Sequence, residues 1–266
     1  MKTAKTFFYS FILSLVVGFV MLGSVDIILS NSSKETDTPK TGIPMREASV
    51  EDSKTILLCI DSSQPFFFIL KFSAIENRVG IAAISPSFKI DDTKLEDKFK
   101  KTGAMQCLMD IENQYDINID YYLQCSWQQL GKMIGDMRDI EINSLGENLP
   151  VSIRNYLFKG ADTLDVKSLI NAAEKARAFL DNEMGLAFLT FSRQWLIENN
   201  IDLLFECTSQ AIKENYSEIV TNINTERLSR MERILHFLAN AHVKHKSVVI
   251  TNDDSLSHEK INSIIQ

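Results

Sequence analysis

An apolar segment near the N-terminus constrains this chain more than any other feature. Residues 7–29 are almost wholly apolar, and Asp26 is the one charged residue among them. A helix rises about 1.5 Å per residue, so about 20 such residues span the roughly 30 Å hydrocarbon core of a bilayer. Lys2 and Lys5 precede the run, and acidic residues follow it. The positive-inside bias predicts an uncleaved single-pass signal anchor in the cell membrane, with residues 1–6 in the cytoplasm.

A cleaved signal peptide is the alternative, although its apolar region would be shorter and no small-x-small cleavage site stands near Gly23. Residues 30–53 are rich in Ser, Thr, Pro and charged residues. Such a segment buries too little apolar surface to offset the entropy of ordering it. We therefore expect a flexible stalk over 30–53 and an extracellular domain over 54–266.

Composition and charge exclude several classes of protein. The chain is 45% hydrophobic and 24% charged, as in ordinary globular proteins. Its net charge of −7 lacks the basic footprint of a nucleic-acid binder, so we expect no nucleic-acid partner. The four cysteines form no C-x-x-C pair, which argues against a zinc module. Cys107 and Cys125 lie in the exported domain, where a disulfide is permitted, and the sequence leaves their pairing open.

Strands and helices are expected to alternate along the domain. Short apolar runs predict strands over 55–60, 66–72, 78–84, 119–125, 140–143 and 247–251. Helices are expected over 95–115, 127–137, 165–180, 185–199, 201–215 and 225–241. Ser126 is the expected N-cap of one helix, with Gln129 at the capping-box position. This order predicts an α/β fold, a three-layer α/β/α sandwich with a mixed central sheet, preceded by one N-terminal transmembrane helix.

Three consecutive phenylalanines, Phe66 to Phe68, indicate a strand with two apolar faces. A central strand covered by helices on both sides explains this pattern and is the interpretation that we favour. A hydrophobic pocket that accepts an acyl or polyprenyl chain is the alternative.

Four segments carry a resemblance to a known family. They are the strand LLCIDSS (57–63), the stretch 103–143 with its IDYY strand, the pair Arg193-Gln194, and the turn Thr221-Asn222-Ile223. In order and spacing they resemble the LytR-CpsA-Psr family over about residues 55–240. That resemblance implies a membrane-anchored extracellular protein of Gram-positive bacteria that transfers a glycopolymer from a polyprenyl-pyrophosphate carrier to peptidoglycan. It also implies a divalent cation, Mg²⁺ or Mn²⁺.

The resemblance also nominates site residues. Asp61 ends the first strand and corresponds to a carboxylate that helps to hold the cation, although an Asp-Ser-Ser turn explains it equally simply. Arg193 and Gln194 match the family's R-Q, and Arg177 stands one residue out of register with a family arginine. Tyr122 is a candidate for a groove that binds sugar or lipid, whereas aromatic residues at such positions are more often core.

Most of the family's arginines have no counterpart here. The family's R-x-D-T-M region reads SSQPFFF, and its S-I-P-R-D reads AISPSF, with Pro86 and Ser87 where Arg and Asp would stand. Each lost charge-assisted phosphate contact removes about 1.5–3 kcal/mol of affinity. We therefore expect a catalytically weakened or non-catalytic protein that acts in cell-envelope assembly by binding or scaffolding.

Two other functions stay open. One is an active transferase, which would need Asp61, Arg193 and Arg177 or Lys71 to meet in one pocket. The other is an unrelated membrane-tethered sensor or interaction domain, which would not share the family's fold. The expected partners are the membrane, a polyprenyl-phosphate-linked glycopolymer or peptidoglycan, and other envelope proteins.

Overall fold

The computed structural model describes residues 47–266 apart from 64, 136, 143–150, 160, 177–182, 252–255 and 266. These residues belong to one compact unit, Glu47–Gln266. The predicted signal anchor and most of the predicted stalk lie outside the described residues. Within the described part, no helix combines the length and the apolarity that crossing a bilayer requires.

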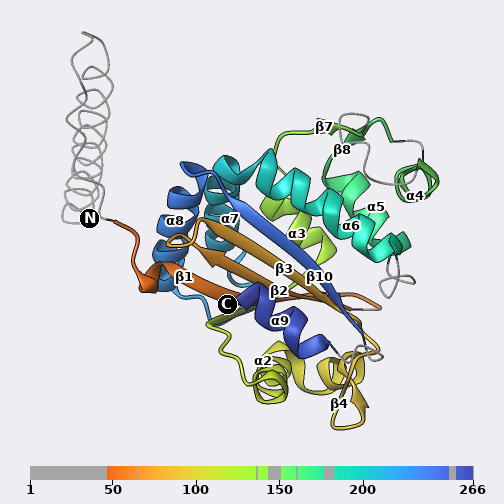
Figure 1. The fold of residues 1–266 in the computed structure, drawn as a ribbon, viewed down its shortest axis with the longest axis vertical. Helices are drawn as coiled ribbons and strands as arrows, with labels where there is room; N and C mark the ends of the chain where they lie inside the picture. The colour runs from red at the N-terminus through yellow and green to blue at the C-terminus, as the bar shows by residue number, and fades with distance from the viewer. Residues whose placement is uncertain are drawn as a thin grey trace, which may run out of the picture. The chain divides into compact units, whose positions relative to one another are not determined.

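A six-stranded mixed sheet forms the centre of the domain, as predicted (Figure 1). Its strands, in spatial order, are β10 (Lys244–Ile250), β3 (Arg78–Ile84), β2 (Phe66–Ser73), β1 (Ser53–Asp61), β6 (Tyr121–Ser126) and β9 (Val220–Thr221). β2 runs antiparallel to both neighbours, whereas β6 is parallel to β1 and β10 is parallel to β3. The four parallel strands β1, β3, β6 and β10 therefore end on the same side of the sheet. We call this side the Asp61 edge and the opposite side, where these strands begin, the Lys54 edge.

Helices cover both faces of the sheet, which confirms the three-layer arrangement (Figure 1). One face packs against α2 (Leu95–Tyr115) and α9 (Ser257–Ile265). The other packs against α3 (Trp127–Ile134), α5 (Val166–Ala176), α6 (Glu183–Arg193), the π-helical segment η4 (Gln194–Glu198), α7 (Ile201–Asn215) and α8 (Thr225–Ala239). The remaining short elements are η1 (Val50–Asp52), β4 (Lys89–Ile90), β5 (Thr93–Lys94), β7 (Ile140–Glu141), α4 (Val151–Leu157) and β8 (Thr163–Leu164).

Alternation along the strands divides the core into two clusters. Phe66 and Phe68 point into the larger cluster, under α3 and α5–α8, whereas Phe67 points into the smaller one, under α2 and α9. The prediction of a strand with two apolar faces is thus confirmed. Both clusters and the whole described sheet lie within residues 47–266, so this segment contains what a domain needs to fold by itself.

Short sequence patterns predicted the start of α3 and the β2–β3 hairpin correctly. Ser126 caps α3 through a capping box with Gln129, as predicted. The strands 66–72 and 78–84 form an antiparallel hairpin, with Asn77 in the left-handed conformation (φ 48°) in its turn. α3 ends at Ile134 rather than at residue 137, and β10 begins at Lys244, three residues before the predicted strand.

A continuous helix over 185–199 was the wrong prediction. The α-helix ends at Arg193 and continues as η4, which ends before Asn200. Distant contacts fix this change: the Trp195 indole N–H and the Asn200 side-chain amide both donate to the Arg138 carbonyl, at 2.7 and 3.1 Å. Asn200 Oδ1 also accepts from the Arg138 N–H at 2.8 Å. The helix geometry thus depends on a segment about 60 residues earlier, which local periodicity does not report.

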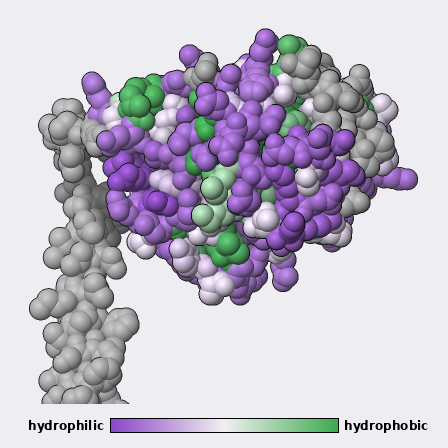
Figure 2. All heavy atoms as spheres, turned by 90° about the horizontal axis from the view of Figure 1, so that it is seen from below, coloured by the Kyte–Doolittle hydropathy of each residue, from purple (hydrophilic) through white to green (hydrophobic). Residues whose placement is uncertain are grey.

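The surface seen from the side of α2 and β4 is mostly hydrophilic (Figure 2). Hydrophobic side chains on this face form small separate spots rather than one patch, and Met105 and Met109 on α2 are among the exposed hydrophobic residues of the domain. Scattered apolar side chains of this kind are normal on soluble surfaces.

Candidate lipid-binding cavity and the Asp61 edge

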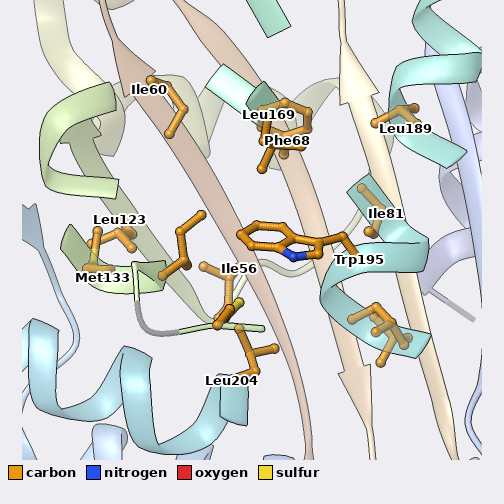
Figure 3. Close-up of a cluster of buried hydrophobic side chains, with 14 of the residues drawn as sticks. Ile56, Ile60, Phe68, Ile81, Leu123, Met133, Leu169, Leu189, Trp195 and Leu204 are labelled. Carbon is orange, nitrogen blue, oxygen red and sulfur yellow. The ribbon is translucent and has the colours of Figure 1, made fainter. Parts of the chain in front are cut away.

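An apolar cavity of about 190 Å³ lies in the larger hydrophobic cluster, between the sheet and α3 and α5–α8. Strand side chains form its floor and helix side chains its roof. Figure 3 shows part of this cluster, in which the Trp195 indole points from η4 across the sheet toward Ile56. The lining residues include Ile56, Leu58, Phe68, Leu70, Phe72, Val79 and Ile81 from the strands, and Trp127, Leu130, Leu189, Leu196, Ile212, Leu228, Met231 and Leu235 from the helices.

The cavity lies toward the Lys54 edge of the sheet. Ile56 and Leu58 are the β1 residues that line it, whereas Ile60, the next residue of that face toward Asp61, is fully buried and does not. The fully buried Phe66 ring packs edge-on against Trp127, with 5.2 Å between centroids. Phe66 and Ile60 are thus outside the lining, whereas Trp127, which follows the register partner of Asp61, is part of it.

Glu232 on α8 interrupts this apolar lining. Among the described side chains that line the cavity, it is the charged one. Its side chain is 23% exposed, and its Oε1 lies 3.1 Å from Lys213 Nζ on α7. Lys213 is 53% exposed. Glu232 therefore contacts both the apolar interior and the surface, at the junction of α7 and α8.

The Asp61 edge carries small neutral polar groups. Asp61 is exposed and accepts a hydrogen bond from Gln124 Nε2 at 3.3 Å. Ser126 is the last residue of β6, and the Ser85 and Ser87 hydroxyls lie 2.8 Å apart after β3. Among the described residues, no three His, Cys, Asp or Glu side chains gather into a metal site.

Arg193 lies far from Asp61. Its Nη2 is 3.4 Å from Glu198, which also lies 3.5 Å from His245 Nε2. Strand pairing places His245 at the level of Lys54, seven residues before Asp61 on β1, which corresponds to about 23 Å along the strand. Burial, together with the charge of Arg193, lowers the pKa of His245. The structure therefore does not bring Arg193 and Asp61 together.

The other candidate residues do not meet at Asp61 either. Gln194 opens η4, where its carbonyl accepts from the Asn199 backbone N–H at 3.1 Å. Tyr122 packs on the α2 face, opposite the cavity, and its N–H donates to Asn222 Oδ1. Lys71 pairs with Thr55, six residues or about 20 Å before Asp61 along β1. Arg177 lies outside the described residues.

Asp120 and the two cysteines whose pairing the sequence left open lie away from the cavity lining. Asp120 accepts from Lys54 Nζ and from the Thr55 N–H, both at 2.9 Å, and is half-buried. Cys107 and Cys125 are free thiols that belong to the clusters on opposite faces of the sheet. Burial raises the pKa of each to about 12, as expected for structural rather than reactive thiols.

Sequence reasoning missed Glu232, although a signal for it exists. Leu228, Met231 and Leu235 form the buried stripe of α8, and Glu232 occupies the next position of the same face, four residues after Leu228. A charged residue on an apolar helical stripe is an error in the pattern unless it serves a purpose. That irregularity can be found without a structure.

Comparison with known proteins identifies solved structures with the same fold. No family model matches the chain, and no curated protein matches its sequence. Several solved structures share the fold. One is a transcription-regulator candidate from Eubacterium siraeum, with a TM-score of 0.59 at 11% identity, covering 87% of this chain and 99% of that one. Another is Lmo1026 from Listeria monocytogenes, described as a transcriptional-factor candidate, with a TM-score of 0.56 at 12% identity, covering 82% and 96%.

TagT also shares this fold. TagT bound to LIIa-WTA has a TM-score of 0.55 at 11% identity, covering 87% of this chain and 98% of TagT. TagT bound to LI-WTA gives the same TM-score at 13% identity, covering 83% and 95%. The chain thus shares the fold of TagT, in agreement with the α/β architecture that the order of strands and helices predicted.

Proposed function

We propose that this protein is a membrane-anchored, extracytoplasmic LytR-CpsA-Psr-like protein that binds the lipid chain of a polyprenyl-linked cell-wall glycopolymer without transferring the polymer. The cavity between the sheet and α3 and α5–α8 carries this proposal. Its lining is apolar apart from Glu232 and the Ser192 hydroxyl, which bonds within α6 to the Phe188 carbonyl. Such a wall binds hydrocarbon and offers little to a sugar or a phosphate.

The size of the cavity limits what it holds. At about 190 Å³ it is somewhat larger than the ~150 Å³ engineered cavity that accommodates one benzene ring. A short apolar chain, or the terminal part of a long one, fits this space without rearrangement. We therefore assign the cavity to part of a lipid chain rather than to a whole polyprenyl group.

The arrangement of charges supports binding over transfer. Asp61 has serine hydroxyls and the Gln124 amide near it at its edge of the sheet, while Arg193 and Lys71 lie about 20 Å or more away along the strands. Phosphoryl transfer depends on positive charge placed at the reacting phosphates. The active-transferase alternative required these groups to converge, and the described ones do not. The unrelated-sensor alternative is disfavoured by the fold shared with TagT.

A thermal-shift titration of residues 47–266 with undecaprenyl phosphate and undecaprenyl pyrophosphate, with and without Mg²⁺ or Mn²⁺, tests this function. A lipid that binds the folded state of the protein raises its melting temperature by mass action. We expect a rise with both lipids, independent of metal, and no release of phosphate from the pyrophosphate. Metal-dependent phosphate release would contradict the proposal and indicate an active transferase.

A cavity-filling variant locates the binding site. Leu70→Phe places a ring in the cavity, because Leu70 lines it, and should abolish the thermal shift. Leu108→Phe makes the same change in the smaller cluster, on the other face of the sheet, and should leave the shift intact. Urea unfolding of both variants first establishes that they fold. Equal loss of binding in both variants would mean that the lipid does not bind in this cavity.

A further inference from the structure

The position of Glu232 indicates where the cavity meets solvent. Toward Asp61, the Ile60 and Phe66 side chains are fully buried and stand outside the lining, whereas Trp127 is half-buried and lines the cavity. At the α7–α8 junction, Glu232 both lines the cavity and stays 23% exposed, and its ion pair with Lys213 reaches the surface. At this ion pair the lining of the cavity reaches the surface of the domain, and we call this place the mouth.

A carboxylate at an apolar mouth has a definite chemical preference. It accepts a hydrogen bond from a hydroxyl group, and it repels a second carboxylate or a phosphate, most strongly where the surroundings exclude water. Lys213 offsets part of that repulsion, but its exposure to solvent weakens its effect relative to the half-buried Glu232.

We propose that Glu232 makes this mouth selective for uncharged chains: it admits an apolar or hydroxyl-ended chain and keeps an anionic lipid head outside the domain. This inference rests on the proposed function and specifies which end of the lipid enters the cavity. A lipid phosphate enters only with its hydrocarbon end first, and its phosphate stays in solvent or at the membrane surface. Such a geometry holds the carrier while leaving its linkage to the polymer untouched.

Eight-carbon ligands test the rule, because in a cavity of this size their polar ends come to the mouth. Binding of 1-octanol and octanoate to residues 47–266 at pH 7.5 is measured by calorimetry and by the fluorescence of Trp127, which lines the cavity. We expect octanol to bind at least tenfold more tightly than octanoate. In Glu232→Gln the two affinities should come within about threefold, through tighter binding of octanoate.

Two variants serve as controls. Glu226→Gln makes the same change on the same helix, at a residue that is 72% exposed, paired with Arg230 and not part of the lining, and should keep the wild-type preference. Lys213→Met removes the cation from the mouth and should weaken octanoate further while sparing octanol. These opposite shifts at Glu232 and Lys213 are what an electrostatic mouth requires.

The outcomes separate this inference from the proposed function. Equal binding of octanol and octanoate by the wild type, or an unchanged ratio in Glu232→Gln, would overturn the selective mouth and leave the lipid site in place. Binding of neither ligand would overturn the lipid site and the mouth together. A preference for octanol that disappears in Glu232→Gln and persists in Glu226→Gln supports both.

Discussion

Asp52 shows how one buried carboxylate joins the start of the domain to its helical layer. Its side chain is fully buried, accepts from the Ser49 N–H at 2.9 Å and lies 3.0 Å from Arg233 Nε on α8. Burial by itself raises the pKa of Asp52, but the Ser49 hydrogen bonds and the Arg233 charge outweigh it, so the pKa lies below its ordinary value. The folded state therefore stabilises the ionised carboxylate.

Asp52→Asn should lower the free energy of unfolding by about 1–2 kcal/mol at pH 7, because the amide keeps the shape but loses the charge-assisted bonds. The half-exposed Arg233 keeps the effect from being larger. Urea unfolding from pH 7 to pH 3 measures this effect. A lowered folded pKa gives stability that is present above the unfolded value of about 4 and is lost as the pH falls through the folded value. The gap between wild type and variant should accordingly close below pH 4, and a gap that stays constant would contradict this assignment.

Asn200 has a similar role with a neutral side chain. It is fully buried, and its amide accepts from the Arg138 N–H and donates to the Arg138 and Trp195 carbonyls. Asn200→Ala should cost about 2–3 kcal/mol, because it leaves buried backbone groups without partners. Asp202→Asn, which removes an exposed ion pair with Arg138, is the control and should cost clearly less. Chemical denaturation of both variants checks the order, and a larger loss in Asp202→Asn would reverse our interpretation.

At the scale of elements, Gly80 and Gly131 differ in how much space surrounds them: Gly80 lies at a tight contact between elements, and Gly131 does not. A Cβ on Gly80 of β3 would lie 2.7 Å from Ile264 Cγ2 and 3.0 Å from the Ile264 carbonyl oxygen on α9. Gly80→Ala should therefore destabilise the domain by about 1–3 kcal/mol by forcing α9 away from the sheet. Gly131→Ala in α3 meets only ordinary contacts, 3.4 Å from Val166 Cγ1, and should stabilise the domain by up to about 1 kcal/mol. Melting temperatures test the contrast, and a shift of the same sign in both variants would refute it.

The contact between Gly80 and Ile264 also shows why the sequence did not predict α9. Elements with a clear local pattern, such as 78–84 and 201–215, were predicted with the bounds that the structure has. The helix over 95–115 has the predicted ends but is broken at Gly103, whose φ is 79°. No element was predicted after residue 251, yet α9 occupies Ser257–Ile265. Its buried contribution is Ile261 and Ile264, too few apolar residues for a periodic signal. α9 packs on the sheet where Gly80 leaves room for Ile264, so its position depends on a residue far earlier in the chain.

The candidate site was less predictable than the fold. The sequence analysis gave a hydrophobic pocket at Phe66 to Phe68 as an alternative, and Phe68 does line the cavity. The rest of the wall comes from elements between β1 and α8, so that no segment carries its signature. Family resemblance pointed instead to Asp61 and Arg193, and strand register places these residues at opposite edges of the sheet. Motif order reported the fold correctly but not which polar groups meet in it.

At the scale of the whole molecule, the proposed function needs the domain and its lipid on the same side of the membrane. The apolar run 7–29 and the lysines before it predict that side to be the outside. A bacterial alkaline phosphatase, which is active only after export because it needs disulfides, should be active when fused after residue 46. Green fluorescent protein at the same position should be dark if it is exported unfolded. Deletion of residues 7–29 should reverse both results.

The same fusion experiment separates an anchor from a cleaved signal peptide. An uncleaved anchor keeps the mass of the unfused chain at 30.2 kDa and leaves it in the membrane fraction after a carbonate wash. Cleavage near Gly23 would shorten the chain and release it from the membrane. Release would count against the proposed function. A domain tethered to the membrane meets membrane lipids at a high effective concentration, which a free domain does not. Retention at full mass, with the fused phosphatase active, is the outcome that we expect.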